Sequence, residues 1–254
     1  MQKNTLIGAV VVLAILFGIV LFGATKPAPV KAPGTAAQIT LPEGSYVEHA
    51  PYYDISANYA TSTPLAGSAN LAAVALMKNF VADTIAQFKT DGNFANLTDE
   101  DIKMMGFDQD RKEKLQIVYL IASSSRTVSY IFTIYEDTLG AHGNTFFKTF
   151  TFSTKDGTEL SLSDLFFTGA RYLDTLSLTS RSKLPDIMGK DATNARMLSD
   201  GTTPDEKNFS SFFLDNRELV ILFAPYQVAP YAAGPQTLRI PLSELSSILN
   251  SEYR

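Results

Sequence analysis

The chain has 254 residues, of which 45% are hydrophobic, and its formal net charge is −5 at pH 7. This acidic balance provides no basic surface for DNA or RNA, so we expect no nucleic-acid partner. With no Cys and only two His, the sequence excludes disulfides, a cysteine nucleophile and thiolate or His-rich metal sites. We therefore expect neither a metal nor a cofactor.

The first predicted element is an apolar helix over residues 5–24, in which no side chain is charged. A helix of this length extends about 30 Å, which matches the hydrocarbon core of a bilayer. We expect a single-pass membrane anchor, with residues 1–4 as a cytoplasmic stub and the rest of the chain outside the cytoplasm. The alternatives are a buried helix of a soluble protein and a cleaved signal peptide, whose apolar segment is usually only about 7–15 residues long.

The composition changes after the anchor. Residues 25–45 are rich in Pro and Ala, which is typical of an extended, semi-rigid linker. We expect two α+β subdomains to follow, over residues 46–153 and 154–250. The predicted fold class is therefore α+β, a mainly antiparallel sheet with packed helices, because strands and helices do not alternate as repeating βαβ units.

The first subdomain begins with an alternating pattern that predicts a strand over residues 52–59. Apolar side chains at helical spacing predict a long helix over residues 69–89. A solvated polar loop is expected over residues 93–114, because its acidic residues lack the spacing of a calcium-binding loop. Three further strands are predicted over residues 115–123, 127–136 and 144–153.

The second subdomain mixes helical and extended patterns. Residues 172–183 and 185–198 are predicted to be helical, and Pro185 begins the second segment. Strands are predicted over residues 209–214, 218–224 and 238–240, and a last helix over residues 242–249.

Few patterns in the sequence indicate catalysis. No Gly-x-Ser-x-Gly motif is present, and His49 and His142 are expected beside a strand and in a turn rather than in a catalytic triad. No phosphate-binding glycine loop precedes a helix. A carboxylate pair for glycoside cleavage stays open, because such a pair is assembled in space rather than in sequence. We expect no enzymatic activity.

The most distinctive segment is residues 223–235, which contains two Pro-Tyr pairs. Proline restricts the backbone, so Tyr226 and Tyr231 are expected to be held in defined directions. Rigid tyrosines provide contact area at little cost in entropy, which suits a recognition surface. The alternative is that both rings close over the sheet and fill the core.

Several segments carry a resemblance. They are the Gly-Ala-His-Gly-Asn turn at residues 140–144, the segment 156–166, Asn208-Phe209, the segment 226–234 and the opening Tyr-Asp-Ile-x-x-x-Tyr at residues 53–59. Together they resemble a pair of linked domains. This pair occurs in the ectodomain of the lysozyme-sensing anti-sigma factor RsiV and in the non-catalytic part of the peptidoglycan deacetylase PdaC.

The resemblance covers about residues 46–250, and it implies an α+β fold on the outer face of a bacterial envelope. It also implies that the chain binds a protein or a cell-wall glycan. It does not imply anti-sigma activity, because only residues 1–4 precede the predicted anchor. Nor does it imply deacetylation, because the chain has neither the length nor the histidines of a metal-binding catalytic domain. Basic lysozyme would complement the acidic ectodomain.

The leading hypothesis is a membrane-anchored, extracytoplasmic binding or sensor module without enzymatic activity. Tyr226, Gln227 and Tyr231 are the first candidate binding residues, and His142 and Asn144 form a second candidate surface. The alternatives are a peptidoglycan hydrolase that uses a carboxylate pair, and a purely structural envelope protein.

Overall fold

The computed structural model describes residues 44–189 and 192–254, and these residues belong to one compact unit. The predicted stub, the predicted anchor at 5–24 and nearly all of the predicted linker lie outside the described residues. Within the described part, the strands form a five-stranded sheet and a three-stranded sheet.

The five-stranded sheet contains its strands in chain order. Strands β2 and β3 run parallel, and the other neighbouring pairs are antiparallel. Parallel neighbours need a long crossover connection, which here contains both helices α1 and α2. The elements of this part are β1 (Ser45–His49), β2 (Tyr53–Asn58), α1 (Gly67–Gly92), α2 (Asp99–Met105), β3 (Glu113–Ser123), β4 (Thr127–Asp137) and β5 (Asn144–Ser153).

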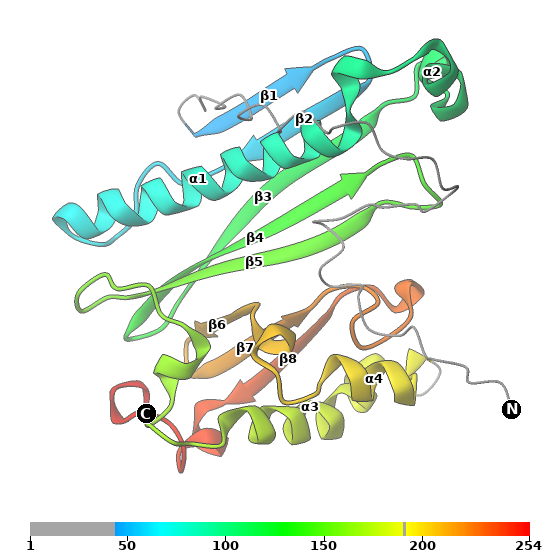
Figure 1. Cartoon of the computed structure of the whole chain (residues 1–254). Coiled ribbons are helices and arrows are strands. Elements are labelled where there is room, and N and C mark those ends of the chain that lie inside the picture. Colours follow the sequence, from blue (N-terminus) through cyan, green and yellow to red (C-terminus); the bar gives the residue numbers. More distant parts are fainter. Residues whose placement is uncertain (1–43, 190–191) are drawn as a thin grey trace, which may run out of the picture. The chain divides into compact units, whose positions relative to one another are not determined.

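Helix α1 covers one face of this sheet (Figure 1). Its inward side chains recur every four residues, so Met77, Val81 and Ile85 are fully buried. Partly buried Phe80 packs edge-to-face on Phe132 and Phe150, with ring centroids 5.5 and 5.6 Å away. This first core is therefore dominated by aromatic rings from β4 and β5 under an aliphatic helix face.

By length and composition, one described stretch, Gly67–Asn96, qualifies as a candidate membrane span. It contains α1, five of whose side chains are buried in the first core. The core helix of a folded domain meets the same criteria, and these contacts identify α1 as such a helix.

The three-stranded sheet consists of antiparallel strands β6 (Phe212–Asp215), β7 (Glu218–Phe223) and β8 (Gln236–Pro241). Helices α3 (Tyr172–Met188) and α4 (Ala195–Gly201) lie on one side of it (Figure 1). The second core is richer in aliphatic side chains, with Phe209 and Phe223 packed edge-to-face among them. Its fully buried aliphatic residues include Leu165, Leu176, Leu184, Leu219, Ile221, Leu238, Ile240 and Leu249.

The two sheets contact each other directly. Ile131 of β4 packs against Phe213 of β6 and Val220 of β7 in a small third cluster. The backbone N–H of Phe212 donates to the buried hydroxyl of Thr149 at 3.1 Å. The hydroxyl of Ser211 donates to the Phe147 carbonyl at 3.1 Å. Strands β4 and β5 are therefore packed on both faces where the second sheet meets them.

The predicted α+β class is confirmed, with mainly antiparallel sheets and packed helices. The predicted first strand, at residues 52–59, corresponds to β2, but β1 precedes it and was not predicted. Its inward residues Tyr46 and Glu48 are polar and its outward Val47 is 61% exposed, so hydrophobic alternation could not reveal it. Glu48 pairs with Lys89 of α1 and accepts a 2.7 Å hydrogen bond from Tyr53.

The expected polar loop at residues 93–114 is wrong in part, because it contains α2. The hydroxyl of Thr98 accepts from the backbone N–H of Asp101, and the Asp101 carboxylate accepts from the Thr98 N–H at 2.9 Å. This capping box begins the helix, and Gly106 ends it in a left-handed conformation.

The helix predictions in the second half also need correction. Helix α3 continues through Pro185 and ends at Met188, so the first expected helix is longer than predicted. The second, at 185–198, consists in part of the end of α3 and in part of α4, which begins only at Ala195. The expected helix at 242–249 is a short 3-10 helix, Leu242–Leu245. Beyond it, the Phe167 N–H donates to the Ile248 carbonyl and the Asn250 N–H to the Leu165 carbonyl, and this pairing ends the helix.

Candidate functional site

The turn between β4 and β5 presents His142 on the surface. Leu139 adopts a left-handed conformation, and its N–H donates to the Asp137 carboxylate at 3.0 Å. Gly143 lies against the ring of Tyr135, where an added Cβ would come within 2.4 Å of the tyrosine oxygen. A side chain at 143 would therefore have to displace the ring of Tyr135, and this close contact lies directly beside His142.

The loop between β7 and β8 carries Tyr226 and Tyr231. Tyr226 has a backbone φ of 69°, which is unusual for a bulky residue and costs conformational energy. Its side chain is 46% exposed. Tyr231 begins a short 3-10 helix, Tyr231–Ala233, and is partly buried. Both rings therefore lie at the surface of the second sheet, and neither belongs to its core.

Gln227 attaches this loop to the body of the protein. Its amide nitrogen donates to the Asn208 carbonyl at 2.9 Å and to the Gly201 carbonyl at 3.2 Å. Its amide oxygen accepts from the Ala224 N–H at 3.3 Å. A Cβ added at Gly201 would lie 1.9 Å from the Gln227 carbonyl oxygen. The predicted binding residue Gln227 thus uses its side chain to hold the loop in place.

The structure brings the turn and the loop together. The imidazole of His142 stacks on the ring of Tyr231, with centroids 3.6 Å apart and planes inclined by 16°. The Tyr226 hydroxyl lies 2.9 Å from His142 Nε2, and the Tyr231 hydroxyl donates to the Gly143 carbonyl at 2.8 Å. We call His142, Tyr226 and Tyr231 the aromatic site.

The hydrogen bonds define the orientation of the histidine ring. His142 Nδ1 lies 3.1 Å from the Gly143 carbonyl oxygen, which can only accept, so Nδ1 carries the proton of the neutral ring. Nε2 then accepts from the Tyr226 hydroxyl. No serine or carboxylate among the described residues bonds to this imidazole, so the arrangement differs from a hydrolytic triad. What it offers is ring faces for stacking and tyrosine hydroxyls for hydrogen bonding.

The other predicted residue, Asn144, is exposed at the start of β5, where it pairs with Glu136 of β4. It takes no part in the contacts of the aromatic site. Tyr135, which lies under Gly143, is a neighbour that the sequence reasoning missed. The alternation of β4 was a signal that could have placed Tyr135 on the outer face of the strand.

Two glutamates on the α1 side of the first sheet are the nearest match to a carboxylate pair. Burial raises the pKa of Glu113 to about 7, and the charges of Glu136 and Asp137 add to the effect. Burial also raises the pKa of Glu136, with a smaller contribution from Asp91. Glu113 is only 5% exposed, which leaves a substrate little access to it. Among the described residues, no group of three or more His, Cys, Asp or Glu is placed to hold a metal ion.

Comparison with known proteins identifies the second half of the chain. Residues 163–243 match the family described as "Protein of unknown function (DUF3298)". Over 147 residues the chain is 35% identical to the peptidoglycan-N-acetylmuramic acid deacetylase PdaC of Bacillus subtilis strain 168. The match covers 56% of this chain and 31% of the deacetylase, so the chain spans about a third of that protein.

One solved structure shows a similar fold. A DUF3298 family member from Bacteroides fragilis aligns with a TM-score of 0.56 at 17% identity, covering 82% of this chain and 92% of that one. A second family member, from Pseudomonas aeruginosa, aligns with a TM-score of 0.48 at 13% identity, covering 85% of this chain and 97% of that one.

Residues 163–243 match the DUF3298 family and the chain shares a region with PdaC, as the resemblance predicted. Tyr226, Gln227 and Tyr231 lie within the matched family segment, whereas His142 precedes it. The aromatic site therefore joins the family segment to the sheet that comes before it.

Proposed function

We propose that this protein is a binding module of a bacterial envelope, held at the membrane by residues 5–24, whose aromatic site recognises a glycan of the cell wall. In this proposal the module binds its ligand and does not cleave it. The observation that carries the proposal is the convergence of three surface rings from two distant segments, fixed by hydrogen bonds and stacking.

The construction of the aromatic site supports recognition. Tyr226 keeps a strained left-handed backbone, and such strain persists where the surrounding structure imposes it, often at functional sites. Gln227 and Gly201 fix the loop, so its rings lose little freedom on binding. Sugar rings have apolar faces that stack on aromatic side chains and hydroxyls that bond to tyrosine, so the surface suits a glycan.

The relationship to PdaC supports the same class of ligand. The name of that protein describes action on the N-acetylmuramic acid of peptidoglycan. The shared region covers less than a third of that deacetylase, which is consistent with a role other than the deacetylation itself. A non-catalytic region can hold an enzyme on its polymeric substrate by binding the glycan. We propose that the present chain binds a glycan in the same way.

The proposal is tested by measuring how the full-length chain, in mild detergent, binds soluble peptidoglycan fragments and, separately, lysozyme. We expect Tyr226→Ala and Tyr231→Ala each to weaken binding of the fragments about tenfold or more, because buried aromatic anchors dominate such interfaces. Phe167→Ala is the matched control, since Phe167 has the same exposed fraction as Tyr226, 46%, and lies outside the site.

Three outcomes would count against the proposal. One is unchanged fragment binding by both tyrosine variants while their circular dichroism stays that of the wild type. Another is tyrosine-dependent binding of lysozyme without binding of fragments, which would make a secreted protein the ligand. The last is turnover of the fragments that Glu113→Gln abolishes, which would favour a hydrolase using the buried carboxylates.

A further inference from the structure

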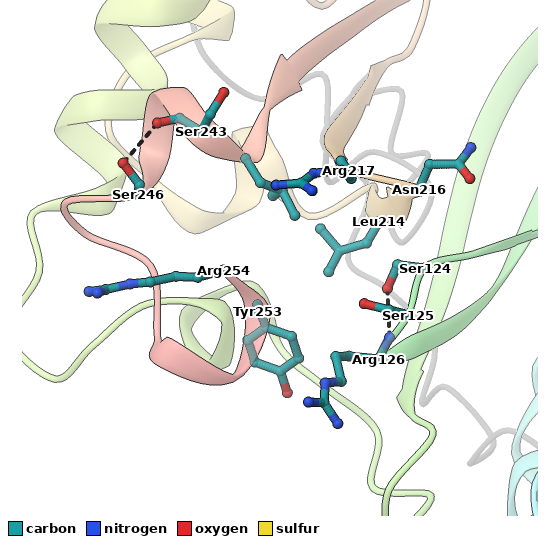
Figure 2. Close-up of a pocket in the computed structure, with 11 residues that line it drawn as sticks. Ser124, Ser125, Arg126, Leu214, Asn216, Arg217, Ser243, Ser246, Tyr253 and Arg254 are labelled. Atoms are coloured by element: carbon teal, nitrogen blue, oxygen red, sulfur yellow. Dashed lines mark hydrogen bonds between the residues drawn. The ribbon is translucent and has the colours of Figure 1, made fainter.

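A cavity of about 560 Å³ opens where the β3–β4 turn, the β6–β7 turn and the last residues of the described chain meet (Figure 2). Leu214 and Leu242 supply its apolar lining. The remaining lining residues are polar or cationic, and none of them is acidic. They are Ser124, Ser125, Arg126, Asn216, Arg217, Ser243, Ser246, Tyr253 and Arg254.

This cavity is far from the aromatic site. The β3–β4 turn and the β4–β5 turn lie at opposite ends of β4, a strand of 11 residues. At about 3.4 Å per residue the two ends are on the order of 35 Å apart. The β6–β7 turn and the β7–β8 loop likewise lie at opposite ends of β7. The cavity is therefore a second, independent feature of the surface.

Two of the three arginines at the cavity have no counter-charge. In residues 44–189 and 192–254, the guanidinium groups of Arg126 and Arg217 make neither an ion pair nor a hydrogen bond. The acids that flank Arg217 are occupied elsewhere, because Asp215 and Glu218 both bind Arg239, at 2.9 and 2.8 Å. Two unneutralised guanidinium groups thus gather at one hollow of a protein whose net charge is −5.

Arg254 and Tyr253 also line the cavity. Arg254 donates from its Nε to the Leu249 carbonyl at 3.1 Å, and Figure 2 shows its guanidinium group pointing away from those of Arg126 and Arg217. Burial, followed by the charges of Glu252, Asp164 and Asp156, raises the pKa of Tyr253. Its hydroxyl therefore stays protonated at neutral pH. Of those three carboxylates, Glu252 pairs with Lys155 at 3.6 Å.

We propose that this cavity binds a phosphate group carried on a polyhydroxylated chain. Guanidinium groups match phosphate oxygens in charge and geometry, and within the described part of the chain Arg126 and Arg217 are both without a counter-charge. The volume is far larger than a single anion and falls within the range of ordinary ligand sites. The serine hydroxyls and the Asn216 amide along its walls suit the hydroxyl groups of such a chain.

The test uses the full-length chain in mild detergent and isothermal titration calorimetry with a glycerol phosphate oligomer. We expect the double variant Arg126→Gln, Arg217→Gln to bind the oligomer about tenfold more weakly or worse, because bonds between charged groups are lost. Added salt should weaken wild-type binding. The control is Arg196→Gln together with Arg171→Gln, which also removes two positive charges, from exposed arginines outside the cavity, and we expect a change of less than about twofold.

Competition experiments identify which chemical group of the oligomer is bound. Inorganic phosphate should compete with the oligomer, and glycerol should not. Equal binding by the double variant and the wild type would overturn the proposal, as would an equal loss in the control with Arg171→Gln and Arg196→Gln. Binding to vesicles of anionic phospholipid without binding of the soluble oligomer would assign the arginines to a membrane surface instead. Thermal unfolding of each variant checks that weaker binding does not result from a loss of folded structure. Tyr226→Ala, in the aromatic site, should leave binding of the oligomer unchanged.

Discussion

The five-stranded and three-stranded sheets each bury one face under helices, but they treat buried polar groups differently. Beneath α1 and near its end, the first sheet buries a glutamate, Glu113, whose carboxyl lies close to two other acids. The first sheet also buries neutral hydroxyls, such as that of Thr149, but among the described residues the buried polar side chains of the second region are all neutral. Ser180 donates to the Leu176 carbonyl at 2.7 Å, and Gln236 donates to the Ala233 carbonyl at 2.7 Å.

This difference separates two sources of stability. A neutral polar group with a partner costs little when buried, at any pH. A buried carboxyl disfavours its charged form, so its cost depends on pH. The first region should therefore lose stability as pH rises from about 4.5 to about 7, through Glu113. Because the sheets share the cluster of Ile131, Phe213 and Val220, each region nevertheless influences the other.

The largest expected effect tests whether the two regions unfold together. Phe132 and Phe223 are fully buried, one in each core. We expect Phe132→Ala and Phe223→Ala each to lower the free energy of unfolding by about 3–5 kcal/mol, because each leaves a cavity. Each variant should show one transition in urea, followed by far-UV circular dichroism and tyrosine fluorescence. Two separate transitions would mean that the contact between the sheets does not couple them.

A smaller effect tests the pH dependence of the first region. The folded pKa of Glu113, about 7, lies above the ordinary value of 4.5. Between these values the folded state holds a proton that the unfolded state has lost, so stability falls as pH rises from about 4.5 to about 7. We expect Glu113→Gln to raise the free energy of unfolding at pH 8 by up to about 3 kcal/mol, and to have much less effect at pH 4.5.

Urea denaturation of wild type and Glu113→Gln at several pH values measures this difference. Glu136, whose pKa is also raised, should leave some residual slope in the variant. Glu100→Gln, on the exposed surface of α2, is the control and should change stability by well under about 1 kcal/mol. A constant difference between Glu113→Gln and the wild type across this pH range would contradict the assignment.

The smallest effect concerns the backbone of the aromatic site. Tyr226→Gly and Tyr226→Ala both remove the ring, but only glycine adopts a φ of 69° without strain. We expect the glycine variant to be more stable than the alanine variant by about 1 kcal/mol. The same pair of changes at Tyr231, which begins a 3-10 helix, is the control. At Tyr231 the glycine variant should be no more stable than the alanine variant. Thermal unfolding measures the difference in stability within each pair.

The sequence pattern predicted those helices and strands in which buried side chains recur at a regular spacing. The helix expected at 69–89 is α1, Gly67–Gly92, and the strand expected at 144–153 is β5. Periodicity reports which side chains a single element buries, so these predictions needed no knowledge of the partners. Strand β1 escaped the same test, because its inward side chains pair with Lys89 rather than enter an apolar core.

The candidate site shows where that reasoning stops. The residue types at 142, 226 and 231 suggested two separate surfaces, and the structure joins them by contacts between positions 84 and 88 residues apart. Nothing local in the sequence encodes such a contact. Gln227 seemed equal to its neighbours as a candidate, yet its side chain reaches Gly201 and Asn208, which belong to other elements. Neighbours in sequence therefore divide into one residue that supports the loop and others that face outward.

The parallel pairing of β2 with β3 has a consequence for the speed of folding. Strands β3, β4 and β5 are joined by short turns, so they can assemble quickly as a meander. Strand β2 can join them only after the whole segment that contains α1 and α2 has closed into a loop, which costs chain entropy before any contact compensates for it. Until then one long edge of the meander, along β3, is unpaired and open to other chains. The crossover thus sets the period during which the newly made protein is most exposed to misassembly.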